Sequence, residues 1–133
     1  MFRCALFRCT FAAAVVAAGL IAPAAAQQQR AFPPDTLRGA MVFGDDRQLS
    51  VNGRATHLSP GSRIRNQDNM IVLSATLAGT RQLVHYTLDA GEAQVRDVWI
   101  LRPDEAAIKP WPSTLEQARS WSFDTTTMRW SKP

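Results

Sequence analysis

A run of polar side chains at residues 63–69 is the clearest candidate for a binding surface. Arg63 and Arg65 are two positions apart, so on a strand both guanidinium groups point to the same face. Guanidinium groups bind carboxylates and phosphates through paired hydrogen bonds. Amide and carboxylate side chains follow at the edge of that face. The predicted surface for an anionic ligand or a partner protein consists of Arg63, Arg65, Asn66, Asp68 and Asn69.

The same polar residues also fit a turn that binds nothing. Asn and Asp tolerate left-handed backbone conformations and form hydrogen bonds with their own main chain. The four residues 66–69 can therefore connect a short strand to a longer one as a solvated hairpin loop. Both interpretations stay open on the sequence alone.

Residues that could support catalysis are few. The sequence has no phosphate-binding glycine motif, no G-x-S-x-G nucleophile and no H-E-x-x-H zinc motif, so we expect no cofactor, no metal and no catalytic residue. His57 and His85 lie on different predicted strands, and a shared zinc site would need carboxylates as well. The acidic pairs Asp45-Asp46 and Asp104-Glu105 fit a turn and the first turn of a helix. A small carboxylate-dependent hydrolase is the enzymatic alternative.

The N-terminal residues 1–26 have the organisation of a cleaved export signal. A basic start with Arg3 and Arg8 precedes the apolar run Phe11–Ile21, and Ala24–Ala26 supplies a small-residue cleavage site. The apolar run is shorter than the roughly 20 residues that span a bilayer. We expect export to the periplasm, with Gln27 as the first mature residue and no membrane span after cleavage.

Removal of this signal changes what the composition means. Cys4 and Cys9 both lie within it, so the mature chain holds no disulfide, thiol nucleophile or thiolate metal site. Without Arg3 and Arg8, 13 basic residues face 11 acidic ones, a net charge of +2 instead of +4. The mature length suits one domain with tails.

Short apolar runs separated by turn signals fill residues 36–102 and predict a small all-β domain. Asn52-Gly53 favours a type I′ hairpin turn, and Ser59–Gly61 predicts another turn. We expect a five- to six-stranded antiparallel barrel, either OB-like or SH3-like. Its predicted strands are residues 38–43, 48–51, 54–58, 62–65, 70–77, 81–88 and 94–101.

The last predicted strand needs a cover. Its residues 98–101 are apolar on both faces, whereas a strand with one face in water alternates. The C-terminal tail, residues 103–133, is short, partly helical and carries Trp111, Trp121 and Trp130, so we expect it to pack on the barrel. Ser113 and Glu116 fit a capping box at the start of a helix. Residues 27–35 form an extended leader.

The order of these pieces resembles a family of exported small β-barrel proteins of OB-like topology from Gram-negative bacteria, many of them uncharacterised. The resemblance rests on "GAMVFGDDRQLSVNGRATHLSPGSRIR" and "LAGTRQLVHYTLDAGEAQVRDVWIL". It covers about half of the chain and consists of turn glycines and apolar positions. It therefore implies a fold and no particular activity.

The function we expect is a non-catalytic binding or interaction module in the periplasm. Its partner would be an envelope protein or an anionic envelope component. Binding of nucleic acid or another anion by an OB-like face is an alternative to the hydrolase. We do not expect nucleic acid as a partner, because the compartment is wrong and single-strand binding needs several exposed aromatic side chains.

Overall fold

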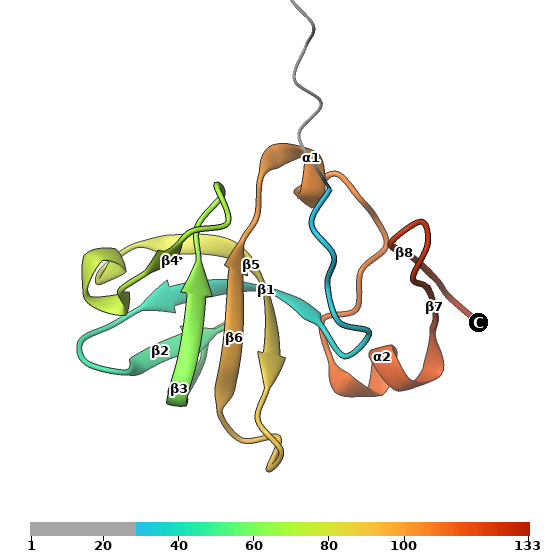
Figure 1. Ribbon diagram of the computed structural model, residues 1–133. Helices are drawn as coiled ribbons and strands as arrows, with labels where there is room; N and C mark the ends of the chain where they lie inside the picture. Colours follow the sequence, from blue (N-terminus) through green and yellow to red (C-terminus); the bar gives the residue numbers. More distant parts are fainter. Residues whose placement is uncertain (1–28) are drawn as a thin grey trace, which may run out of the picture.

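The computed structural model describes residues 29–133, so the predicted signal peptide and the start of the leader lie outside the described residues. Figure 1 shows a β-barrel beside a smaller C-terminal part, with the leader and α1 between them. In chain order the elements are β1 (Leu37–Phe43), β2 (Gln48–Val51), β3 (Arg54–Arg65), β4 (Ile71–Val72), η1 (Ser74–Leu77), β5 (Arg81–Leu88), β6 (Val95–Ile100), α1 (Pro103–Ala106), α2 (Leu115–Ser120), β7 (Ser122–Asp124) and β8 (Arg129–Ser131).

Five strands close the barrel in the circuit β1–β2–β3–β6–β5–β1, and β4 adds a short edge strand to β3. The predicted all-β barrel is thus confirmed. One pairing differs from the antiparallel expectation, because β3 and β6 run parallel. We expected either an OB-like or an SH3-like barrel. Closure through a parallel pair formed by the third and the last strand of the barrel is the OB-like arrangement.

The barrel interior follows the alternation of the strands. In β1 every second residue faces inward, from Leu37 through Met41 to Phe43. Val84 and Tyr86 from β5, with Val98 from β6, fill the opposite side. Burial of Tyr86 raises the pKa of its hydroxyl. These side chains pack together as the core of the barrel.

The β2–β3 hairpin turns at Asn52 and Gly53, as predicted. Both residues have positive φ angles, 51° and 83°, as a type I′ turn requires. A side chain at Gly53 would meet no atom within 4 Å, so only the backbone conformation calls for glycine here.

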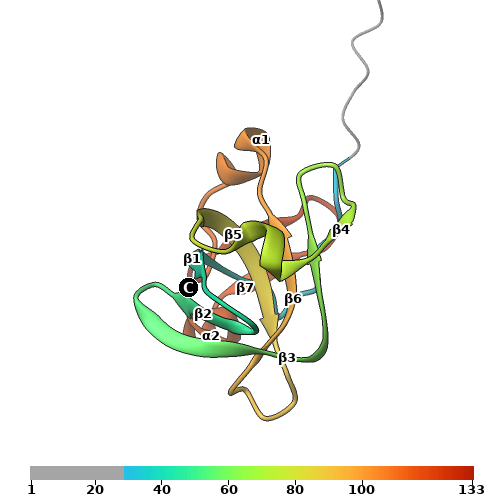
Figure 2. The ribbon, with the colours of Figure 1, turned by 90° about the vertical axis from the view of Figure 1, so that its left-hand side faces the viewer.

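The predicted turn at Ser59–Gly61 is wrong, because β3 continues through it. The register of β3 against β6 shifts between Leu58 and Arg63, and Gly61 has a φ of 75°. The next paired positions are five residues apart on β3 and two apart on β6, so the segment interrupts the pairing without ending the strand. The first half of β3 can therefore pair with β2 and the second half with β6 and β4 (Figure 2).

The predicted strand at residues 70–77 is also wrong for most of its length. β4 pairs only Ile71 and Val72 with β3, although Arg63 and Ser62 of β3 would lie opposite the next two residues in the same register. The chain leaves the sheet after Val72. The chain then forms the short 3₁₀ helix η1. Met70, Ile71 and Leu73 are exposed, so apolar composition alone did not indicate a buried strand here.

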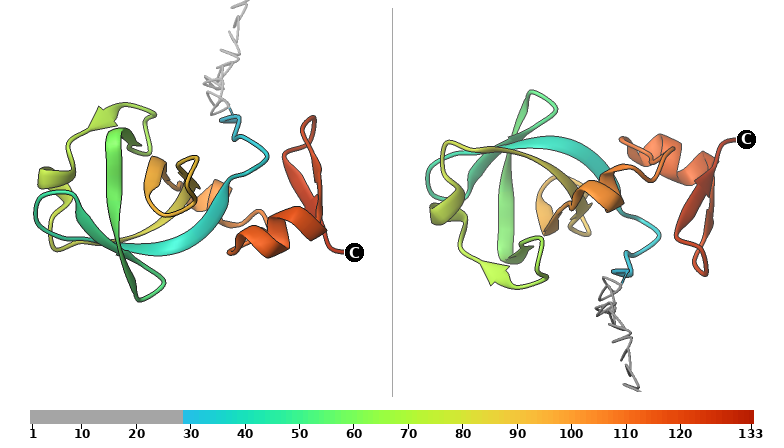
Figure 3. Two further views of the ribbon diagram at one scale, coloured as in Figure 1. Left: turned by 90° about the horizontal axis from the view of Figure 1, so that it is seen from below. Right: turned by 90° about the horizontal axis from the view of Figure 1, so that it is seen from above.

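A second apolar cluster lies outside the barrel, between β5, β6 and the C-terminal part. Its buried members are Phe32, Leu101, Trp111 and Trp130, and it includes the half-buried Trp99. Figure 3 shows the leader running between the barrel and the tail, where Phe32 enters this cluster. The outward apolar face of β6 is thus covered from both ends of the described chain.

The C-terminal helix begins one residue later than predicted. Thr114, not Ser113, is the N-cap, and its hydroxyl accepts a hydrogen bond from the Gln117 amide. Gln117 in turn accepts one from the Ser113 amide, so Gln117 has the role that was predicted for Glu116. After α2 the chain ends in the β7–β8 hairpin, which places Trp130 opposite Phe123.

Candidate functional site

The residues 66–69 form the tight turn between β3 and β4. The Asn66 amide donates to the Met70 carbonyl, and the Asn69 amide donates to the Asn66 carbonyl. The Asn66 side-chain oxygen accepts from the amides of Asp68 and Met70, both at 3.0 Å. Asn69 has a φ of 62°. The turn interpretation therefore accounts for Asn66, whose side-chain oxygen stabilises the loop, but it does not use the side chains of Asp68 and Asn69.

These two side chains line a cleft of about 790 Å³ together with Arg65. We call it the turn cleft; its walls are leader residues 29–31, Arg65, Gln67, Asp68, Asn69, Trp99 and Arg102. The volume lies within the range of small-molecule sites. Of the five predicted residues, the structure brings Arg65, Asp68 and Asn69 to the cleft. Asn66 is not part of its lining, and Arg63 is exposed outside it, opposite Asp97 of β6.

The parallel pairing of β3 and β6 puts Arg65 directly beside Trp99. Both side chains are partly exposed. Phe32 contacts the Trp99 ring edge-to-face, with 5.6 Å between ring centroids. The cleft thus combines a guanidinium group with an aromatic ring that the leader supports.

The polar rim of the cleft has groups available for a ligand. Within residues 29–133, the side chains of Arg65, Asp68 and Asn69 form no hydrogen bond or ion pair. Gln67 is held, because its amide nitrogen donates to the Leu101 carbonyl at 3.0 Å. Arg102 forms ion pairs with Asp104 and Glu105.

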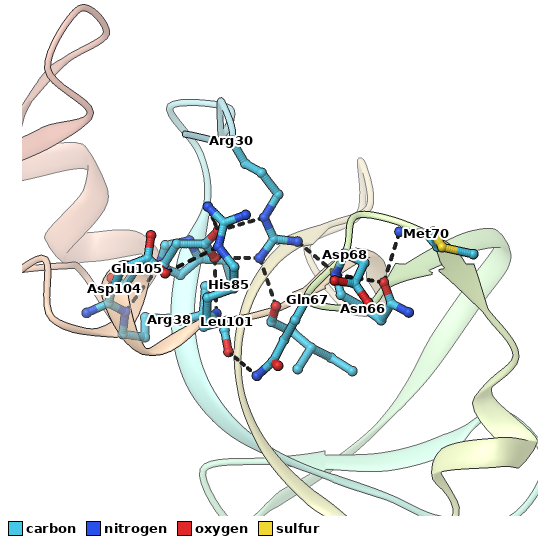
Figure 4. A network of polar contacts seen from close by, with 12 residues as sticks. Arg30, Arg38, Asn66, Gln67, Asp68, Met70, His85, Leu101, Asp104 and Glu105 are labelled. Atoms are coloured by element: carbon cyan, nitrogen blue, oxygen red, sulfur yellow. Dashed lines mark hydrogen bonds and ion pairs between the residues drawn. The ribbon is translucent and has the colours of Figure 1, made fainter. Parts of the chain in front are cut away.

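A buried charge network fixes one wall of the cleft (Figure 4). Arg30 donates to both carboxylate oxygens of Glu105, to the Ile100 carbonyl at 2.8 Å and to the Asn66 carbonyl at 2.9 Å. The side chains of Arg30 and Glu105 are only 6% and 2% exposed. One guanidinium group therefore ties the leader, the end of β6, α1 and the β3–β4 turn together.

A second arginine extends this network behind the cleft. Arg38 donates to the carbonyls of Glu105 and Ile108 and, from Nε, to His85 Nε2 at 3.1 Å. His85 is sandwiched between Trp111, stacked at 4.0 Å, and Phe32. Burial, with the charges of Arg38 and Arg30, lowers the pKa of His85 to about 2. His85 is therefore a neutral acceptor in a packed layer.

The hydrolase alternative requires two facing carboxylates in a cleft. A second cleft, of about 470 Å³, is lined by Asp35, Asp89 and Glu92. Asp89 caps a turn by accepting from the amides of Ala93 and Gln94, and Glu92 forms an ion pair with Arg119. Two of the three carboxylates of this cleft, Asp89 and Glu92, are therefore engaged in contacts within the protein.

Metal and nucleic-acid chemistry find little support in the same part of the chain. Among the described residues no three His, Cys, Asp or Glu side chains come close enough to hold a metal ion. On the outer face of β2 and β3, Gln48 lies opposite His57 and Ser50 opposite Ala55. Apart from His57, this pair of strands offers no ring for stacking bases.

No helix within residues 29–133 has the length and apolarity that a membrane crossing demands.

Sequence reasoning missed Trp99, Arg30 and Glu105 as parts of the site. In the sequence Trp99 is one of the apolar residues 98–101. No pattern of neighbouring residues indicates the strand pairing that puts it beside Arg65. Arg30 and Glu105 are 75 residues apart. The sequence matches no protein-family model, and no curated protein or solved structure matches it significantly.

Proposed function

We propose that the chain is an exported, non-catalytic binding module of the periplasm of a Gram-negative bacterium, and that the turn cleft binds an anionic component of the cell envelope. The observation that carries the proposal is the set of three polar side chains, Arg65, Asp68 and Asn69, which are free of partners within residues 29–133 and share one cleft with Trp99. Unpaired polar groups on a fixed wall are what a ligand site needs.

The remaining support comes from what surrounds the cleft. The barrel interior is filled with side chains, and the carboxylates of the second cleft are largely engaged in the protein's own contacts. The basic, apolar and small-residue segments of residues 1–26 favour export. An exported chain is in the same compartment as the components of the cell envelope, so such a component could enter the cleft from the solvent.

Two measurements test this function. Fractionation of cells should find the chain in the periplasm, and N-terminal sequencing should start at or near Gln27. The purified mature chain should sediment with an insoluble envelope preparation, and Arg65→Gln should reduce the bound fraction several-fold because it removes the cation of the cleft.

Arg63→Gln is the matched control, because Arg63 lies two residues away on the same strand but outside the cleft. It should bind like the unchanged protein. A chain that keeps Met1 in the cytoplasm contradicts export, and sedimentation that is unaffected by Arg65→Gln contradicts the assignment of the site.

A further inference from the structure

The turn cleft holds two kinds of recognition chemistry side by side. Trp99 offers a partly exposed aromatic ring, and its neighbour across the parallel pairing, Arg65, offers a cation. Asp68 and Asn69 supply a carboxylate and an amide to the same cleft. A ligand that uses all four groups needs an apolar ring face, an anionic group and several hydroxyl or amide groups.

We propose that this ligand is an acidic saccharide, a glycan whose sugar rings carry carboxylate groups. The C–H face of a sugar ring packs against the Trp99 indole, while a ring carboxylate binds the Arg65 guanidinium group through paired hydrogen bonds. Sugar hydroxyl groups donate to Asp68 and exchange hydrogen bonds with Asn69. This inference rests on the proposed function and names the class of ligand for the same site.

Asp68 favours a saccharide over a bare anion. Sulfate brings only acceptor oxygens, phosphate keeps at most one or two O–H donors near neutral pH, and the Asp68 carboxylate repels the negative charge of both. The positive charges of Arg30 and Arg102 do not compensate, since the two guanidinium groups already form ion pairs with the two carboxylates of Glu105 and Asp104. Hydroxyl groups turn the same carboxylate into a favourable acceptor.

The cleft is ordered before the ligand arrives, which lowers the entropic cost of binding. Arg30 holds the Asn66 carbonyl, and Gln67 holds the Leu101 carbonyl, so the first two residues of the turn are attached to neighbouring segments. Phe32 supports the Trp99 ring from the leader side. Asp68 and Asn69 therefore project from a turn whose backbone is fixed.

The test is a calorimetric titration of the mature chain with two tetrasaccharides of equal length. One alternates glucuronic acid with N-acetylglucosamine, and the other contains N-acetylglucosamine only. The acidic tetrasaccharide should bind at least tenfold more tightly than the neutral one. Arg65→Gln should remove this preference, Trp99→Leu should weaken both sugars about tenfold, and Arg63→Gln should change neither. A thermal melt of each variant confirms that it is folded.

Other outcomes overturn the inference. Equal affinity for the two tetrasaccharides removes the role of the carboxylate, and inorganic phosphate that binds as tightly as the acidic sugar indicates a bare anion site. Tighter binding of adenosine monophosphate assigns the ring to a nucleotide, and a Trp99→Leu variant that binds normally removes the stacking. If no tetrasaccharide binds while Arg65 is still required for sedimentation with the envelope preparation, the saccharide is wrong and the proposed function stands. If that sedimentation is also absent, both fail.

Discussion

Replacing Glu105 with glutamine tests whether the buried charge network holds the leader and the turn cleft in place. Glu105 is 2% exposed, forms ion pairs with Arg30 and Arg102, and accepts a hydrogen bond from the Arg102 amide. Glutamine keeps the shape but leaves the Arg30 charge buried without a counter-ion, which costs about 3–5 kcal/mol. That is a large part of the roughly 5–15 kcal/mol by which small domains are stable. For a domain of about 100 residues the melting temperature should fall by about 12–20 °C.

Urea denaturation followed by tryptophan fluorescence measures this loss. Asp104→Asn is the matched control, because Asp104 is the neighbouring residue, its side chain is 57% exposed and it pairs only with Arg102. Its loss should stay below about 1 kcal/mol. The double replacement Arg30→Met with Glu105→Leu should recover most of the stability, since it removes both buried charges together. A Glu105→Gln variant as stable as Asp104→Asn would show that the ion pair between Arg30 of the leader and Glu105 does not stabilise the folded protein.

Three further changes probe the second cluster and the hairpin. The pKa of His85 is lowered to about 2 in the folded state and is near 6.5 in the unfolded state, so between these values the unfolded state binds one more proton. The free energy of unfolding should therefore fall by about 1.4 kcal/mol per pH unit as the pH drops from 6.5 to 4.5. Urea titrations at several pH values should show this slope in the unchanged protein and not in His85→Gln. Gly53→Val should cost about 1–2 kcal/mol at its φ of 83°, whereas Gly53→Asn should cost clearly less, and equal melting temperatures would remove the I′ assignment. Trp130→Ala should lower the free energy of unfolding by about 3–5 kcal/mol, because Trp130 is buried. Lys132→Ala is the control, and its loss should stay below about 1 kcal/mol because Lys132 is exposed and contacts the face of the Trp121 ring. A smaller loss for Trp130→Ala in urea denaturation would mean that the tail is loosely attached.

The features that the sequence predicts well are those with a local cause. The Asn52-Gly53 turn and the strand at Arg81–Leu88 follow from residue types and alternation within a few positions, and the structure has both. The break at Ser59–Gly61 and the strand at 70–77 failed for a different reason. Whether a glycine ends a strand or bends it, and how far a strand continues, depends on partners that are distant in sequence. Here β6 lies beside β3 on both sides of the register shift, and β4 ends after Val72, where the chain leaves the sheet and forms η1.

The same distinction divides the candidate site. Arg65, Asp68 and Asn69 lie within five residues of one another, at the end of a strand and in the turn that follows it. Their common place in the cleft could therefore be predicted from the sequence. Trp99 joins them only through the parallel pairing of β3 with β6, and Arg30 reaches the turn only because Glu105 lies across the fold. A guanidinium group at position 30 in a polar leader gave no sign of burial, since buried arginines are rare and depend on a partner. That dependence connects stability to recognition, because one group neutralises Glu105 and also holds the Asn66 carbonyl of the turn. The leader is therefore part of the wall of the turn cleft, and the shape of the cleft depends on a contact that no single segment of the chain specifies.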